Sequence, residues 1–410
     1  MANTLLTISD ITREALAVLH EEAQLLKSCS RKYDSRFARS GGKIGTSVDI
    51  RKPVKYSVTS GADLTGATQD SLESAVTLTM DKRKTIGMTF TSEDLTLKID
   101  DFSQRFLRPA VARLARQVDL DIAEAVLKQA FRVNRSDITA AIGFQDIVTA
   151  NAQLSSQFAN GDRNLYIDAF NDADVVNANK GLFQSSEKIA SQYEKGVMGI
   201  AGGFKFIESE SLSSIAFSGT LTAGAVNDAS AANGDTTITL DGITGTATSI
   251  KKGQAFTIAG VYQVDPETLT ALPRLYPFVA AADATITGGA ATVTIANAIY
   301  AVGYANKSQV NISALPANDA AVTFLEGAAT AGDSAPVILG MAMDSVAFAS
   351  VDLELPNVSK MEGRESYDGV SMRIVKTYDG LTDEGLYRLD LLYGIQVLRP
   401  EHTVSMIGKV

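Results

Sequence analysis

Residues 76–90 have the two-residue period of a β-strand, with apolar residues on one face at each end of the run and Lys82 and Lys84 on the same face between them. Every second residue from Val76 to Phe90 shares one face, and this period predicts a β-strand with one face in solvent. At about 3.3 Å per residue the strand would be about 50 Å long, whereas ordinary strands end at about 10 residues. The run therefore needs a long partner strand and a cover for its apolar face.

A second alternating run covers residues 44–58 and supplies that partner. Its polar face carries Pro53, which is typical of an edge strand. The polar connector TSGADLTGATQDSLESA lies between the two runs. We predict an extended antiparallel hairpin over 44–90. Because a lone two-stranded hairpin is marginal in water and its open edges invite pairing, we expect another molecule to complete it.

Two stretches have the three-and-four spacing of amphipathic helices. Residues 10–28 predict a helix near the N-terminus, and residues 109–131 predict a helix of about 34 Å that serves as a domain spine. Pro109 favours a helix that starts or bends near Arg108. The apolar stripes are Leu16, Leu19, Ala23 and Leu26 in the first helix, and Val111, Leu114, Ala115, Val118, Ile122 and Ala125 in the second.

The rest of the chain separates into a mixed part and a β part. Residues 145–217 form the mixed part, and we predict helices at 144–159 and 171–181 and strands near 164–169 and 202–212. From 219 to 335, short β runs alternate with Gly, Asn and Asp turns, which is typical of a small barrel or sandwich. Residues 335–356 predict a helix followed by a strand, and residues 385–408 predict one or two terminal strands.

Composition and charge narrow the class of protein. The chain has 410 residues, a formal net charge of −10 and one cysteine, so room for two or three domains is available and no intrachain disulfide can form. The acidic total argues against tight wrapping of nucleic acid. Charge is uneven: residues 27–55 carry nine Lys/Arg and two Asp, and residues 219–335 carry four Lys/Arg and nine Asp/Glu. Such blocks are either solvated surface or a basic arm that meets acidic partners.

Three separated segments together resemble the major capsid proteins of tailed bacteriophages. They are EDLTLKIDDFSQRFLRPAVARLARQVDLDIAEAVL, KKGQAFTIAGVYQVDPET and YRLDLLYGIQVLRP, in this order along the chain. The branch they resemble is the coat proteins of short-tailed phages with an inserted β-barrel domain. The loop NDASAANGD at 227–235 is short where relatives carry a longer acidic loop, so we do not carry over the twofold contact of that loop.

The resemblance implies an α+β major capsid fold with five parts. These are an N-terminal arm at 1–43, an extended-loop hairpin at 44–90, a peripheral domain with the spine helix at 91–135 and 336–376, an axial domain at 136–218 and 377–410, and the inserted barrel at 219–335. Subunit contacts would come from the arm and the extended loop. The candidate interface residues are Arg31, Lys32, Arg51, Lys55, Tyr56, Asp63, Asp70, Lys82, Arg83 and Lys84.

The resemblance also implies what the protein binds and where it works. Copies would form the pentamers and hexamers of an icosahedral shell around double-stranded DNA, with a scaffolding protein during assembly and a portal at one vertex. DNA contacts would be non-specific, and no membrane would be involved. Without a signal peptide or an apolar run of about 18 residues, we expect assembly in the host cytoplasm and residence in the virion.

No pattern in the chain predicts catalysis, a cofactor or a metal site. His20 is expected to be a solvated helix residue, His402 a structural residue and Cys29 a passive small side chain. The motif SGGKIGTS at 40–47 lacks the full spacing of a phosphate-binding loop, so we expect a hinge there. Two other hypotheses remain: a secreted or surface β-rich adhesin, and an enzyme with a carboxylate pair within 136–217.

Overall fold

The computed structural model describes residues 8–32, 46–56, 58, 61, 71–91, 103–135, 138–179, 199–355, 362–380, 382 and 384–409. The chain divides into two compact units. Unit 1 comprises 1–49, 77–122 and 346–398, and unit 2 comprises 50–76, 123–345 and 399–410. Both units mix helices and sheets, as expected for an α+β protein.

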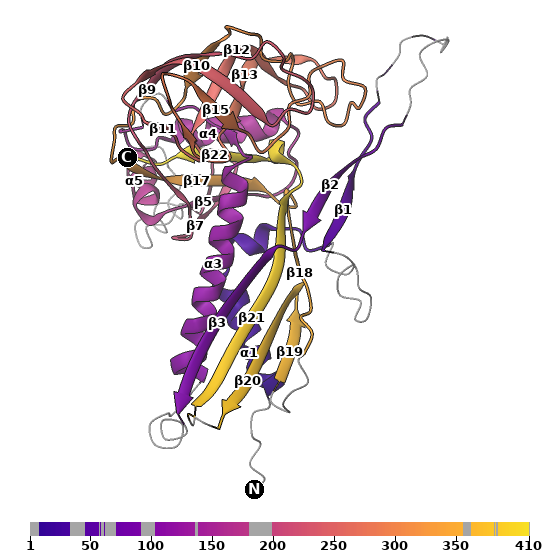
Figure 1. The fold of residues 1–410 in the computed structure, drawn as a ribbon, viewed down its shortest axis with the longest axis vertical. Helices are drawn as coiled ribbons and strands as arrows, with labels where there is room; N and C mark the ends of the chain where they lie inside the picture. The colour runs from indigo at the N-terminus through magenta and orange to yellow at the C-terminus, as the bar shows by residue number, and fades with distance from the viewer. Residues whose placement is uncertain are drawn as a thin grey trace. The chain divides into compact units, whose positions relative to one another are not determined.

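Unit 1 is built on the long strand β21 (Glu384–Val397). β3 (Lys82–Thr91), β20 (Val370–Asp379) and β18 (Val346–Ser350) all pair antiparallel with it, and β19 (Glu362–Tyr367) follows β20. Figure 1 shows β3, β21, β20 and β19 side by side. Ten residue pairs from Lys82 to Thr91 join β3 to β21, so this half of the 76–90 run has its partner within the chain.

The predicted continuous strand over 76–90 is therefore wrong. Residues Met80 and Asp81 separate β2 (Ser74–Thr79), which pairs with β1 (Ser47–Lys52), from β3. The alternation stays in phase across the break, because Leu78, Met80 and Lys82 are two residues apart. Periodicity reports which face is covered, and it does not report a change of partner strand.

The two helices predicted from their apolar stripes are present. α1 (Ile8–Glu22) continues into the short 3-10 helix η1 (Leu25–Ser28) and packs on β19 and β20. α3 (Arg108–Leu127) follows the π-helical turn η3 (Ser103–Leu107), so the helix starts at Arg108, before Pro109. The stripe residues of both helices are buried apart from Ala125, which is half-buried. α3 ends at Leu127, four residues before the predicted end.

Unit 2 contains a sheet in which parallel and antiparallel pairs mix. Its order is β4-β22-β17-β5-β7-β6, with β8 also paired to β17, and the central strand β17 runs antiparallel to β22 and β5. α4 (Phe144–Ser156) and α5 (Ala169–Asn179) also belong to this unit. The strands are β4 (Phe131–Arg132), β5 (Arg163–Ile167), β6 (Ile200–Ala201), β7 (Phe204–Glu208), β8 (Ser214–Ala216), β17 (Ser334–Ala342) and β22 (Thr403–Ile407), the last preceded by η4 (Pro400–His402).

Close packing in this sheet depends on one glycine. A Cβ atom added to Gly340 in β17 would lie 2.6 Å from Cγ2 of Val404 and 3.2 Å from Cε1 of Phe204. Carbon atoms of two different side chains cannot lie 2.6 Å apart, so a side chain at position 340 would displace its neighbours. Because Gly340 has no Cβ atom, Val404 of β22 and the ring of Phe204 can pack against the middle of β17.

The predicted β segment at 219–335 forms a six-stranded antiparallel sheet in the order β13-β12-β16-β9-β10-β15. A bridge between Ala280 and Ile295 links the residues that follow the two outermost strands. The strands are β9 (Leu221–Val226), β10 (Thr237–Gly245), β12 (Ala255–Val264), β13 (Ala271–Val279), β15 (Ala291–Thr294) and β16 (Ala321–Phe324), and β11 (Ser249–Ile250) pairs with β14 (Ala284–Thr285). We name residues 219–335 the insertion. Its core is continuous with that of the β17 sheet.

Three further sequence expectations need correction. Within the predicted segment 335–356, the described residues 335–355 contain the strands β17 and β18 and no helix. Residues 334–342 pair within unit 2 rather than with the peripheral sheet, while 377–379 and 384–397 pair within unit 1 rather than with the axial sheet. The segment SQVNISAL forms isolated bridges at Ile312 instead of a strand. In each case long-range pairing decided the outcome, which local composition does not encode.

Candidate subunit interface

The two-stranded sheet β1–β2 is the part of the predicted 44–90 hairpin in which the two runs pair with each other. We name this sheet and its flanking residues, 46–56, 58 and 71–80, the ribbon. Apolar side chains on one face are buried, including Val48, Ile50, Leu78 and Met80. The polar face is tied across the strands. The Thr77 hydroxyl donates to Asp49 Oδ1 at 2.7 Å. These contacts give the ribbon a definite register within the chain.

The part of the ribbon nearer its tip is held by polar pairs and exposes apolar side chains. Arg51 Nη1 lies 3.1 Å from Glu73 Oε2, and the hydroxyls of Tyr56 and Ser71 lie 2.7 Å apart. Tyr56, Leu72 and Val58 are exposed, Val58 to 99 %. Isolated exposed apolar residues are common, but three on one ribbon provide contact area for another surface.

Lys55 lies in a different environment from its exposed neighbours. It is half-buried, and burial lowers its pKa, which the carboxylates of Glu401 and Glu267 act to raise. Lys55 therefore faces acidic groups of its own chain. Asp63 and Asp70 lie outside the described residues.

The N-terminal candidates are engaged within unit 1. Arg31 Nη1 donates to the carbonyl of Asp368 at 2.9 Å and also pairs with its carboxylate. His20 packs edge-on against Tyr367 at 5.2 Å, and burial lowers its pKa. The expectation of a solvated His20 is wrong, because the turn between β19 and β20 covers it. Lys32 is exposed. The described part of the predicted arm is thus folded on its own unit.

Lys82 and Lys84 face the spine helix. Their Nζ atoms lie 3.8 Å and 3.0 Å from Oδ2 of Asp121, and the Tyr393 hydroxyl donates to the same oxygen at 2.7 Å. Burial raises the pKa of Asp121, but hydrogen bonds from Tyr393, Lys84 and Gln117 outweigh it and lower the pKa. The two lysines therefore neutralise a carboxylate of their own chain.

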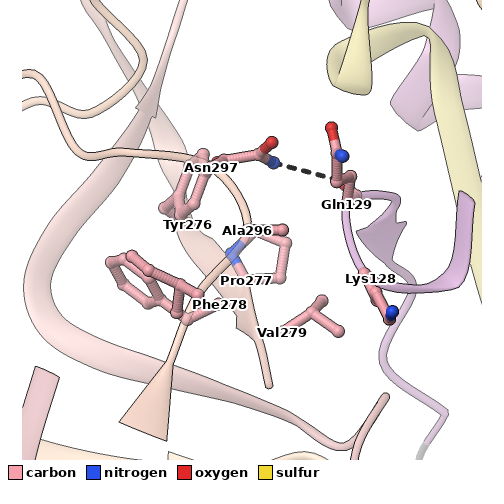
Figure 2. Close-up of a pocket in the computed structure, with 9 residues that line it drawn as sticks. Lys128, Gln129, Tyr276, Pro277, Phe278, Val279, Ala296 and Asn297 are labelled. Atoms are coloured by element: carbon pink, nitrogen blue, oxygen red, sulfur yellow. Dashed lines mark hydrogen bonds between the residues drawn. The ribbon is translucent and has the colours of Figure 1, made fainter. Parts of the chain in front are cut away.

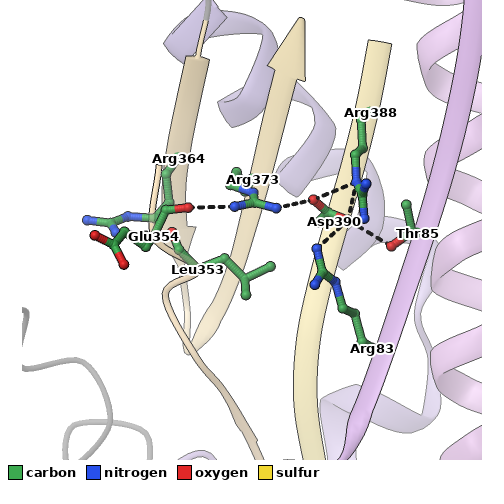
Figure 3. Close-up of polar contacts among 8 residues, drawn as sticks. All are labelled: Arg83, Thr85, Leu353, Glu354, Arg364, Arg373, Arg388 and Asp390. Atoms are coloured by element: carbon green, nitrogen blue, oxygen red, sulfur yellow. Dashed lines mark hydrogen bonds and ion pairs between the residues drawn. The ribbon is translucent and has the colours of Figure 1, made fainter. Parts of the chain in front are cut away.

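Arg83 lies on the opposite face of β3, in a cluster around Asp390. Figure 3 shows Arg83, Arg373, Arg388 and Thr85 directed at this carboxylate. Asp390 is fully buried although it lies on the face turned away from α3, because the arginines cover it. One carboxylate balances one of the three guanidinium charges. The side chain of Arg83 remains 46 % exposed, so this face of the sheet presents positive charge.

Sequence reasoning missed the acidic partners of these cations. Asp121 lies 37 residues from the candidate Lys84. Asp390 pairs with the candidate Arg83 and lies 305 residues from its other partner in β3, Thr85. A buried Asp within a strand of apolar residues, as in YRLDLLY, was the available signal, since buried carboxylates require paired cations or hydrogen bonds. Phe170 and Ile200 are exposed apolar residues in the structure. The sequence around them has no pattern that predicts this exposure.

A pocket in unit 2 offers no catalytic constellation. Figure 2 shows it between the turn after α3 and strand β13, with the amide of Asn297 donating to the Gln129 carbonyl at 3.2 Å. Lys128 is the one charged residue in its lining, and its Nζ pairs with Glu124 at 2.9 Å. The lining residues are Lys128, Gln129, Tyr276, Pro277, Phe278, Val279, Ile295, Ala296 and Asn297. It contains no acid–base pair.

The part of the chain that the structure describes offers neither a metal-ion cluster nor a membrane-spanning helix. No group of three or more His, Cys, Asp or Glu side chains there is placed to hold a metal ion. None of the helices described has both the length and the apolar character to span a bilayer. Cys29 is buried, and burial raises the pKa of its thiol.

Comparison with known proteins identifies relatives over nearly the whole chain. The family model described as P22 coat protein, gene protein 5, matches residues 5–408. No curated protein matches the sequence. Similar solved structures include a chain of Mycobacterium phage Che8, with 12 % identity, a TM-score of 0.48, and coverage of 94 % of this chain and 90 % of that chain. The capsid of Ralstonia phage GP4 matches with 8 % identity, a TM-score of 0.43, and coverage of 89 % and 83 % respectively.

Proposed function

The chain belongs to the P22 coat protein family and is a major capsid protein of an icosahedral phage shell, and we propose that its copies join as pentamers and hexamers through the ribbon. The observation that carries this proposal is the isolation of β1 and β2. Each has one hydrogen-bonded neighbour among the described strands, so each keeps an open edge. Open edges and exposed apolar side chains favour pairing with another chain.

Charge indicates which surface of a neighbouring copy the ribbon meets. Residues 57–81 carry Asp63, Asp70, Glu73 and Asp81 and no Lys or Arg. The face of the unit 1 sheet around Arg83 carries more guanidinium than carboxylate charge. We propose that the acidic segment 57–81 of one copy, which includes the second strand of the ribbon, docks on this basic face of the next. Exposed charges are screened over about 8–10 Å at physiological salt, so assembly should weaken as salt rises.

Weak contacts suffice when they are repeated. Once one contact tethers two copies, the next contacts form at high effective concentration, and the overall affinity exceeds that of any single contact. A shell built in this way assembles from subunits that are soluble one by one. The function therefore requires the ribbon to be held within the subunit and still available to a neighbour.

We propose which part of the chain forms each domain of a capsid subunit. The sheet around β21 with α1 and α3 is the peripheral domain, and the sheet around β17 with α4 and α5 is the axial domain. Residues 219–335 are the inserted barrel, supported by the Ala280–Ile295 bridge between its outermost strands. Residues 1–43 and the ribbon mediate contacts between copies.

The remaining partners are those that a phage shell needs. We propose that a scaffolding protein directs assembly, that a portal occupies one vertex, and that the shell encloses double-stranded DNA through non-specific contacts. The net charge of −10 limits attraction to the DNA phosphates. Assembly takes place in the host cytoplasm in this proposal, and the subunit has no enzymatic role. The family match does not support the adhesin hypothesis.

Removal of the ribbon tip tests the proposal. Residues 57–70 are replaced by a short Gly-Ser linker, and the subunit is compared with the unchanged chain by urea unfolding, sedimentation and negative-stain electron microscopy. We expect a folded subunit that no longer forms shells, with or without scaffold. Shells of normal size and yield from the shortened chain would overturn the role of the ribbon.

A further inference from the structure

The second strand of the ribbon rests on a loop of the insertion. The hydroxyls of Ser74 and Ser308 lie 2.7 Å apart, and the Asn306 amide donates to the Glu73 carbonyl at 3.4 Å. Ser74 is only 7 % exposed. Two consecutive ribbon residues therefore bind residues more than 230 positions away in sequence.

The loop is ordered for this contact by its own hydrogen bonds. Asn306 Oδ1 accepts from the Ser308 hydroxyl at 2.6 Å and from the Ser308 amide at 3.2 Å. Because the hydroxyl has a single proton, which points at Asn306, the Ser308 oxygen is left to accept from Ser74. One side chain, Asn306, thus binds the ribbon and also orients the second binding group.

The first strand of the ribbon reaches the same loop through the second strand. Arg51 Nη1, in β1, lies 3.1 Å from Glu73 Oε2, and the Glu73 carbonyl accepts from the Asn306 amide. The loop at 304–309 therefore supports both strands, the second directly and the first through Glu73.

We propose that this loop of the insertion, residues 304–309, forms a brace that sets the direction of the ribbon before it docks on a neighbouring copy. The inference rests on the proposed role of the ribbon in assembly. A two-stranded ribbon without support samples many orientations, and a segment that is already ordered costs less entropy to dock. The insertion is thus a positioning element for assembly, through residues such as Asn306 and Ser308.

The test removes the brace and leaves the fold of the insertion. The double variant Asn306→Ala/Ser308→Ala is compared with Asn318→Ala/Ser230→Ala, which removes the same two groups from exposed sites of the insertion, where they bind Asp319 and Asp228. We expect equal urea midpoints for the two unassembled subunits. We also expect exchange of the amide hydrogens over 74–79 to be about tenfold faster in the brace variant, as for loss of one or two hydrogen bonds. The brace variant should form fewer or misshapen particles.

A cross-link supplies the converse experiment. With Ser74→Cys/Ser308→Cys, the two side chains are close enough for a disulfide, and Cys29 is buried. The oxidised subunit should assemble at least as well as the reduced one. Two outcomes would overturn the inference. One is a brace variant whose amide exchange and assembly equal those of the control, and the other is assembly that the cross-link blocks.

The tip deletion distinguishes this inference from the proposal on which it rests. If the tip-deleted chain assembles, the ribbon proposal fails. If the tip-deleted chain does not assemble and the brace variant assembles normally, only the brace fails.

Discussion

The Nε atom of Arg132 lies 3.0 Å from Oε1 of Glu326, and 1 % and 3 % of the two side chains are exposed. Arg132 is in β4, directly after the spine helix, and Glu326 follows β16 of the insertion. The Ala255 amide donates to Glu326 Oε2 at 2.8 Å, and Arg132 Nη2 donates to the Gly253 carbonyl. This pair therefore joins the insertion to the β17 sheet inside unit 2.

Loss of one partner of this pair should be costly. Glu326→Gln leaves the guanidinium of Arg132 buried without a counter-charge, and we expect a loss of about 3–5 kcal/mol in the free energy of unfolding. The double variant Arg132→Met/Glu326→Gln should recover part of that loss, because the unpaired charge is gone. Urea unfolding followed by circular dichroism measures both. Equal destabilisation by the single and double variants would contradict this account.

Asp390 should make the subunit sensitive to acid. Burial raises the pKa of Asp390, but hydrogen bonds from Arg373, Thr85 and Arg388 outweigh it and lower the pKa to about 2. In the unfolded chain the pKa of an aspartate is about 4. The ionised Asp390 therefore stabilises the fold fully above about pH 4, and this stabilisation disappears as the pH falls from about 4 to about 2. Asp390→Asn should lose stability at pH 7 and lose this part of the pH dependence. Urea midpoints of the unchanged chain and of Asp390→Asn, measured between pH 2 and 7, test this prediction. If the midpoints of the two proteins change with pH in parallel, Asp390 is not the cause of the acid sensitivity.

Asp119 should act in the opposite direction. Burial raises its pKa to about 6, although the amides of Gln24 and Leu26 donate to it at 2.7 Å and 3.2 Å. The folded state then binds more protons than the unfolded state, so stability falls as the pH rises from about 4 to about 6. Asp119→Asn keeps an acceptor and removes the charge, and should reduce this fall.

The matched variant Asp119→Ala removes the acceptor as well. It leaves the amides of Gln24 and Leu26 unpaired in a buried place, which costs about 1–3 kcal/mol. Unfolding of the Asn and Ala variants at pH 5 and pH 8 separates the two effects. If Asn and Ala destabilise equally at pH 8, the hydrogen bonds from the η1 segment contribute nothing measurable.

Gly394 lets the ribbon lie against β21. A Cβ atom at this position would approach the carbonyl oxygen of Thr79 to 2.2 Å, so Gly394→Ala must displace one strand. We expect a loss of about 1–3 kcal/mol or more, since insertion of volume into packed structure strains it. Gly380→Ala, whose nearest neighbour would be a Tyr378 ring carbon at 3.8 Å, is the control. Thermal unfolding that is unchanged in Gly394→Ala would contradict this.

Local order was largely predictable from the sequence. The stripes of α1 and α3, the start of the spine helix beside Pro109, and the β character of residues 219–335 followed from period and composition. Each of these features depends on a few neighbouring residues. The spacing of the apolar residues decides which face of a helix or strand is apolar, and residues with a restricted backbone, such as proline, decide where a helix starts or ends. The resemblance of three segments to phage capsid proteins agrees with the family match over residues 5–408.

Tertiary structure alone decided which elements meet. Lys82 and Tyr393 become neighbours across more than 300 residues, and the in-phase alternation from 76 to 90 gave no sign that its second half pairs with β21. The same holds for Arg83, which the sequence presents as a free cation and the fold turns toward Asp390. Strand pairing and charge pairing are set by the packing of the complete chain, because the free energy of each contact depends on what else is buried around it.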